Sequence, residues 1–188
     1  MNSSTRRLIG LDPGLRFTGW GVVDMRGTKL THIANGAVRS DAKLTLAERL
    51  LQLERGLAEV FDNYQPDYAA VEQTFVNRDG AATLKLGQAR AVCLLEPARR
   101  GIRVAEYAPN FIKRSVTGSG HADKGQIAGM VKVLMPKAEI ANEHAADALA
   151  VAITLAHAGD FSGKLQAAIA QADARAETVR KKKRGAVI

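Results

Sequence analysis

Apolar residues near the start of the chain gather in three short runs that are separated by turn residues. The runs cover 7–12, 19–24 and 30–38, and each has the length and composition of a strand. The connections between them are short, and short turns favour antiparallel hairpins. We therefore expect the chain to open with a three-stranded antiparallel meander.

A helical pattern follows at 45–64, where leucines recur at spacings of three and four and form one apolar stripe. Thr45 and Glu48 have the spacing of a capping box at the helix start. The segments after this helix predict a strand at 68–72, a helix at 81–100 and a strand at 102–107. Because each of these strands is approached through a helix, both should run parallel to the first strand.

Two more helices are expected at 124–135 and 141–157, and the second is rich in alanine and apolar on most sides. Such a helix is usually buried against a sheet. The resulting order, β-β-β-α-β-α-β-α-α, is the α/β ribonuclease-H-like arrangement, in which helices cover both faces of a mixed five-stranded sheet. Three antiparallel strands precede two parallel ones. We expect one such domain at 1–158 and a basic helical or disordered tail at 159–188.

The chain has 188 residues and a net charge of +8, which favours a polyanionic partner, most often nucleic acid. Without the basic segment 175–184 the net charge falls to +3, so the rest of the chain is only mildly basic. The single cysteine, Cys93, lies in an apolar run and is expected to be a buried structural thiol. The polar start lacks a signal-peptide core and no apolar stretch is long enough to cross a bilayer, so a cytoplasmic protein is expected.

Two acidic residues, Asp12 and Glu72, each end an apolar strand. A charged group at such a position is costly to desolvate unless something compensates it. In the predicted sheet the two strands are central neighbours, so the carboxylates repel each other unless a cation lies between them. Magnesium, which takes oxygen ligands and retains water, is the ordinary solution. Asp12 by itself is equally consistent with a residue that caps its own turn.

The last predicted helix adds His144 and Asp147, which stand three residues apart and therefore share one face. The small residues around them allow the helix to approach the sheet closely. Each residue alone is explained as well by a helix cap or a partner of the helix dipole. Four such groups on converging elements favour a functional site.

Five motifs stand in order along the chain: GLDPG at 10–14, TGWG at 18–21, EQTF at 72–75, ATLKLGQAR at 82–90 and HAADALA at 144–150. Together they closely resemble the RuvC family of Holliday-junction resolvases. The resemblance implies a homodimeric, divalent-metal-dependent endonuclease that nicks two strands of like polarity at a four-way DNA junction. It also implies 5′-phosphate and 3′-hydroxyl ends, a role in recombination and repair, and a junction-migrating helicase complex of the RuvA–RuvB type as partner.

The family's four catalytic and metal-binding positions fall on Asp12, Glu72, His144 and Asp147. Two Mg²⁺ ions per site are expected, with Mn²⁺ as a substitute, and Asp12 would bridge them. Many members carry Asp where this chain has His144. A neutral imidazole binds transition metals better than magnesium. His144 is therefore expected either to bind metal or to act as the general base that activates water.

Candidate DNA contacts are one aromatic and several basic residues. Phe75 follows the fourth strand closely and either stacks on a base at the crossover or belongs to the core. The basic residues resemble the family's DNA-binding positions or are placed to contact phosphate: Lys113, Arg114, Lys124, Arg78 and Lys85.

Two other functions compete with this interpretation. Actin-like phosphotransferases also carry Asp and glycine after a first strand, but they need two such domains, and only one fits in this length. A junction-binding protein without nuclease activity is the second alternative, although it would gain nothing from repelling carboxylates beside phosphate. Apolar residues of 81–100 serve either a dimer interface or the core.

Overall fold

The computed structural model describes residues 4–74 and 79–159 and contains one five-stranded mixed sheet. Its strand order is β3-β2-β1-β4-β5. β1 pairs with β2 and β2 with β3 in antiparallel fashion, whereas β4 runs parallel to both β1 and β5. This topology confirms the predicted meander and the two parallel strands. The strands are β1 (Arg6–Asp12), β2 (Phe17–Arg26), β3 (Lys29–Arg39), β4 (Tyr68–Glu72) and β5 (Arg103–Tyr107).

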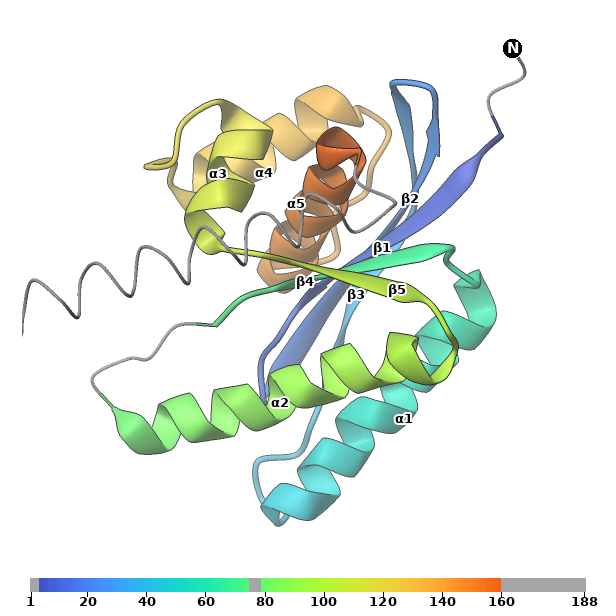
Figure 1. The fold of residues 1–188 in the computed structure, drawn as a ribbon. Coiled ribbons are helices and arrows are strands. Elements are labelled where there is room, and N and C mark those ends of the chain that lie inside the picture. The colour runs from blue at the N-terminus through green and yellow to red at the C-terminus, as the bar shows by residue number, and fades with distance from the viewer. Residues whose placement is uncertain (1–3, 75–78, 160–188) are drawn as a thin grey trace, which may run out of the picture.

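Helices cover both faces of this sheet, as the sequence predicts (Figure 1). One face carries α1 (Leu46–Tyr64) and α2 (Gly80–Arg99). The other face carries α3 (Pro109–Thr117), α4 (Lys124–Leu134) and α5 (Glu143–Ala158). The ribonuclease-H-like α/β fold class is confirmed.

The helix α3 was not predicted, so the expected order of elements is wrong at this point. Pro109 occupies the first turn, where its missing N–H costs nothing. Ile112 and Val116 lie one helical turn apart and are both buried. Gly118 ends the helix in the left-handed conformation with φ of 79°. The sequence pattern does not reveal this short helix, because the helix has only two core positions and begins almost directly after β5.

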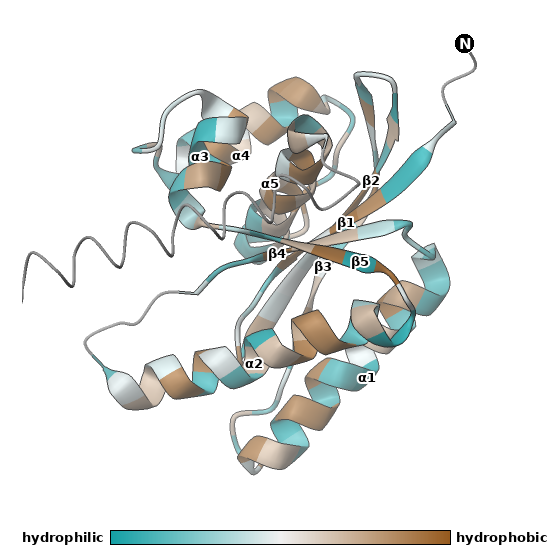
Figure 2. Cartoon of the chain, viewed as in Figure 1, coloured by the Kyte–Doolittle hydropathy of each residue, from teal (hydrophilic) through white to brown (hydrophobic). Residues whose placement is uncertain are grey.

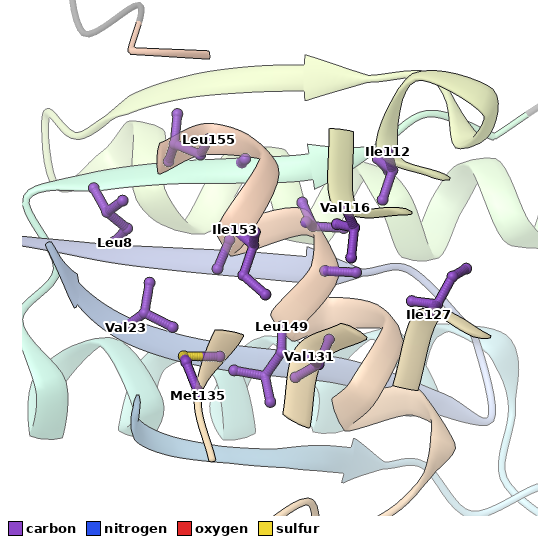
Figure 3. Close-up of a cluster of buried hydrophobic side chains, with 14 of the residues drawn as sticks. Leu8, Val23, Ile112, Val116, Ile127, Val131, Met135, Leu149, Ile153 and Leu155 are labelled. Carbon is purple, nitrogen blue, oxygen red and sulfur yellow. The ribbon is translucent and has the colours of Figure 1, made fainter. Parts of the chain in front are cut away.

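Alternation along the central strands separates two hydrophobic cores. Leu8 of β1 faces the core beneath α3, α4 and α5, whereas Ile9 faces the core beneath α1 and α2. Figure 3 shows the first of these cores, where side chains from the sheet and the three helices meet. The strand residues that share a face with Leu8 therefore point toward α5.

Three glycines let α5 lie unusually close to the sheet. A Cβ atom on Gly10 would come within 2.2 Å of the Ala148 carbonyl oxygen, and one on Gly19 within 2.1 Å of the His144 carbonyl oxygen. A Cβ atom on Gly21 would lie 2.8 Å from the Leu149 side chain. No side chain fits at these positions, because the helix backbone occupies the space. The first turn of α5 is thereby held directly over β1 and β2.

Some of the predicted features lie outside the described residues. These are Phe75, Arg78 and all of the predicted tail after Gly159.

The capping box at Thr45 and Glu48 is present at the start of α1. Cys93 is fully buried, as expected. Within 4–74 and 79–159, the longest apolar helix falls short of what a membrane span requires.

Candidate active site

Asp12 and Glu72 are the last residues of two neighbouring strands. Leu11 pairs with Val71 in the parallel register of β1 and β4, so the two acidic residues that follow lie side by side. Leu11 and Val71 face the core of α1 and α2. Because side chains alternate along a strand, both carboxylates point to the opposite face, toward α5. Figure 1 shows these two strand ends and α5 in one region of the molecule.

His144 and Asp147 come from the first turns of α5. Asn142 caps this helix by accepting a hydrogen bond from the Ala145 backbone N–H at 3.0 Å. The close contact at Gly19 seats the His144 backbone on β2, and His144 Nδ1 lies 3.7 Å from Asp12 Oδ2. The fold thus brings together all four residues that the sequence singles out.

Burial and mutual repulsion make these carboxyl groups hard to ionise. Burial, followed by the nearby Asp147 charge, raises the pKa of Asp12 to about 6. Burial, followed by the charges of Asp12 and Asp147, raises the pKa of Glu72 to about 8. Burial also raises the pKa of Asp147, against the opposing effect of Lys124. A cation bound among these carboxyl groups would favour their ionised form and would therefore displace their protons.

The chemistry of this donor set fits a hard divalent metal. Three carboxyl groups offer oxygen ligands, two at the ends of β1 and β4 and one on α5, and positive charge would relieve their repulsion. Within the described residues, no three acidic, histidine or cysteine side chains lie closely enough together to hold a metal ion as they stand.

Two of the predicted basic residues lie at this site. Lys124 Nζ is 3.2 Å from Glu143 Oε2 and 3.5 Å from Asp147 Oδ2. Lys113 and Lys124 line, together with Glu72 and Asp147, a cavity of about 150 Å³. The cavity therefore brings acidic and basic side chains together.

The structure does not bring the other described basic residues into this cavity. Lys85 is exposed on α2, and Arg114 is exposed in the last turn of α3. Phe75 and Arg78 lie outside the described residues.

The sequence reasoning missed an aromatic neighbour of His144 and two arginines that lie against that neighbour. The Phe17 ring stacks on the His144 imidazole, with centroids 5.3 Å apart and an interplanar angle of 22°. The Arg16 and Arg39 guanidinium carbons lie 5.5 and 5.9 Å from the Phe17 ring centroid. The strand register could have indicated Phe17. Gly19 pairs with Asp12, and Phe17 stands two residues before Gly19 on the same face of β2.

The mixed sheet and the acidic cluster at its centre define a nuclease of the ribonuclease-H-like class. The family described as crossover junction endodeoxyribonuclease RuvC matches residues 8–155. The chain belongs to this family of metal-dependent nucleases, which hydrolyse phosphodiester bonds in DNA. The matched region contains Asp12, Glu72, His144 and Asp147.

Relatives with the name crossover junction endodeoxyribonuclease RuvC match nearly the whole domain. The protein of Parvibaculum lavamentivorans is 58% identical over 166 residues, covering 88% of this chain and 95% of its own length. That of Rhizobium meliloti is 62% identical over 154 residues, covering 82% and 91%. The solved structure of Thermus thermophilus RuvC in complex with a Holliday junction substrate superposes with a TM-score of 0.75 at 31% identity, covering 81% of this chain and 94% of that one.

Proposed function

We propose that this chain resolves four-way DNA junctions by paired, symmetric nicks during homologous recombination and repair. Metal-assisted attack of water on a phosphodiester would leave 5′-phosphate and 3′-hydroxyl ends. The observation that carries the proposal is the convergence of Asp12, Glu72 and Asp147 with His144 at two neighbouring strand ends. Membership of the family and the junction complex of the Thermus thermophilus relative support it.

Magnesium is the proposed metal, with two ions per site and manganese as a substitute. Asp12 would contribute to both ions, while Glu72 and Asp147 would each hold one. When bound, the ions would activate the attacking water and neutralise charge on the leaving oxygen. His144 would either complete the second metal site or take the proton from the water.

The basic residues would position the DNA around this cluster. Lys113 and Lys124 line the cavity beside the carboxylates and are proposed to hold the phosphate at the cleavage point. Arg78, Lys85 and Arg114 are proposed to contact phosphates farther away. Phe75 is proposed to stack on an unpaired base at the crossover.

A homodimer is proposed, because two symmetric cuts require two sites related by a two-fold axis. Exposed apolar residues on α2 support this helix as the place where the two copies meet. Leu84 is 72% exposed and Leu95 is 47% exposed, and exposed Ala91 lies between them on the same side of the helix. Figure 2 shows that α2 carries apolar residues along much of its length. A helix face of this kind fits a second copy of the chain.

The partner and the place of action follow from the proposed substrate. A junction-migrating helicase complex of the RuvA–RuvB type would deliver the crossover to this enzyme. We propose that both act in the cytoplasm, where the chromosomal DNA of a bacterial cell lies.

The test is nicking of a synthetic four-way junction against a linear duplex of the same sequence, in magnesium and in EDTA. Wild type should make paired nicks in the junction alone, and only with metal. Glu72→Gln should abolish cleavage while retaining junction binding, because it keeps the shape of the side chain but removes a charged ligand. Glu59→Gln is the matched control, since Glu59 is exposed on α1 away from the cluster.

Two results would contradict the proposal. Equal cleavage of junction and duplex would reject junction selectivity. Tight junction binding without cleavage in magnesium or manganese would replace the nuclease with a non-cleaving junction binder.

A further inference from the structure

The stack of Phe17 on His144 joins two segments that are distant in the sequence. Phe17 is the first residue of β2, and His144 lies in the first turn of α5. Their ring centroids are 5.3 Å apart with planes tilted by 22°, which is a stacked arrangement. The contact therefore depends on the place of α5 over the sheet.

The backbone beneath Phe17 is held firmly. A Cβ atom on Gly14 would lie 2.2 Å from the Phe17 carbonyl oxygen, so the turn before β2 folds tightly onto this residue. The Thr18 hydroxyl donates a hydrogen bond to the Gly14 carbonyl oxygen at 2.8 Å. Phe17 also pairs with Arg39 in the β2–β3 register. These contacts fix the backbone from which the Phe17 side chain projects.

The Phe17 ring also has cationic neighbours. The Arg39 guanidinium carbon lies 5.9 Å from the ring centroid, and that of Arg16 lies 5.5 Å away. Guanidinium groups over an aromatic face are attracted to its electron density. Phe17 is therefore confined by Arg16, Arg39 and His144 together.

Among the residues that the structure describes, Asp12 is the polar side chain in contact with the His144 ring. Its Nδ1 lies 3.7 Å from Asp12 Oδ2, which is within ion-pair distance but longer than a well-formed hydrogen bond, so this contact restricts the ring only loosely. An imidazole that binds metal or moves a proton is normally oriented by a hydrogen bond from its second nitrogen. Among the described residues, the contact with the Phe17 face takes that place.

We propose that Phe17 is a positioning residue, which holds the His144 imidazole so that Nδ1 faces Asp12 and Nε2 is directed away from it. This inference rests on the proposed nuclease function, in which His144 acts beside the carboxylates. Phe17 does not touch the reacting atoms. It acts by restricting the rotation of a ring that does.

The kinetic test is a double-mutant cycle between Phe17 and His144, measured as single-turnover junction cleavage. Phe17→Leu should slow cleavage about tenfold, as expected when the partner that orients a functional histidine is lost. Phe17→Tyr should restore the rate, because the stacked ring is kept. In a His144→Ala background, Phe17→Leu should change the residual rate less than about twofold, since there is no ring left to position.

A matched control shows whether the effect belongs to His144. Tyr64→Leu removes another ring contact, with Trp20 at 5.5 Å, and should leave the rate unchanged. Junction binding in EDTA should stay within about twofold of wild type for Phe17→Leu, which separates positioning from loss of DNA contact. Equal losses from Phe17→Leu in both backgrounds would overturn the proposal.

A spectroscopic measurement on the metal-free protein does not depend on cleavage. The chain has four histidines, so the His144 ring resonance can be assigned by its absence from the His144→Gln spectrum. The Phe17 ring should displace that resonance, Phe17→Leu should remove the displacement, and Phe17→Tyr should keep it. An unchanged resonance in Phe17→Leu would overturn the inference even if the nuclease is active. If wild type fails to cleave the junction, the proposed function is rejected, but the histidine spectra still show whether Phe17 positions His144.

Discussion

At the scale of single residues, the ionised carboxyl cluster lowers the stability of the folded protein, and the same mutual repulsion favours the binding of cations. Asp12 and Glu72 carry raised pKa values chiefly because they are buried, and then because acidic neighbours repel them. The folded protein therefore keeps protons that the unfolded chain has already released. Folding is favoured at low pH by this effect, and the advantage disappears as the pH rises through the raised pKa values.

The metal-free protein should accordingly lose about 1–3 kcal/mol of stability between about pH 5 and pH 8 through these groups. Magnesium should raise the unfolding temperature more at pH 8 than at pH 5, because it binds the ionised cluster of the folded state alone. Thermal unfolding in EDTA and in magnesium measures both effects. Glu72→Gln should flatten the pH dependence in EDTA, whereas Glu59→Gln should not. The same slope in both variants would assign it to other groups.

His144 sets a second expectation at the residue scale, because imidazole nitrogen suits manganese better than magnesium. The His144→Asp variant should show a several-fold lower ratio of the manganese rate to the magnesium rate than wild type. Single-turnover cleavage with each metal gives the ratio. An unchanged ratio would show that His144 is not a metal ligand and would favour its role as the general base.

At the scale of elements, the placement of α5 depends on strand glycines as much as on the small residues of the helix. Gly10, Gly19 and Gly21 share one face of the sheet, and each lies against α5. The closeness that they permit brings His144 and Asp147 within reach of the strand-end carboxylates. A strand residue without a side chain thus helps to position the residues of the candidate site.

Gly19→Ala should therefore push away the first turn of α5, because its Cβ atom would overlap the His144 carbonyl oxygen. We expect a loss of about 1–3 kcal/mol in stability, as for an overpacked core, together with a large loss of cleavage. Gly129→Ala is the control, since Gly129 lies in α4 with open space around it and alanine favours a helix. Chemical unfolding and junction cleavage are the measurements. Wild-type cleavage by Gly19→Ala would show that the close approach is dispensable.

At the scale of the whole molecule, the two faces of the sheet have separate roles. The face under α3, α4 and α5 carries the candidate active site, and the opposite face presents the exposed apolar residues of α2. In the proposed dimer, this division would leave both clusters open to DNA. Arg90 of α2 pairs with Glu106 of β5, which ties the proposed interface helix to the sheet.

Leu84→Glu should convert the proposed dimer to a monomer, because it places a charge within the apolar face of α2. Sedimentation analysis measures the change, and junction cleavage should shift from paired cuts to single nicks. Val133→Glu is the control, since Val133 is 67% exposed on α4. A Leu84→Glu protein with the mass and paired cutting of wild type would place the interface elsewhere.

Much of this molecule was predictable because its signals are local. The periods of two and 3.6 residues located nine of the ten described elements. The acidic strand ends and the pair on the last helix pointed to one site. The helix α3 was missed because two buried residues, Ile112 and Val116, are too short a pattern to distinguish a helix from a loop.

The sequence by itself indicated the antiparallel meander, the parallel direction of β4 and β5 and, through the ribonuclease-H-like order of elements, the meeting of Asp12 with Glu72. These follow from connection lengths and from the order of strands and helices along the chain. Only the tertiary structure decided that Phe17 stacks on His144, that Lys124 reaches Asp147, and which leucines of α2 stay exposed. Such contacts depend on how closely and at what angle a helix lies on a sheet, and this is set by side-chain packing between segments that are far apart in the chain.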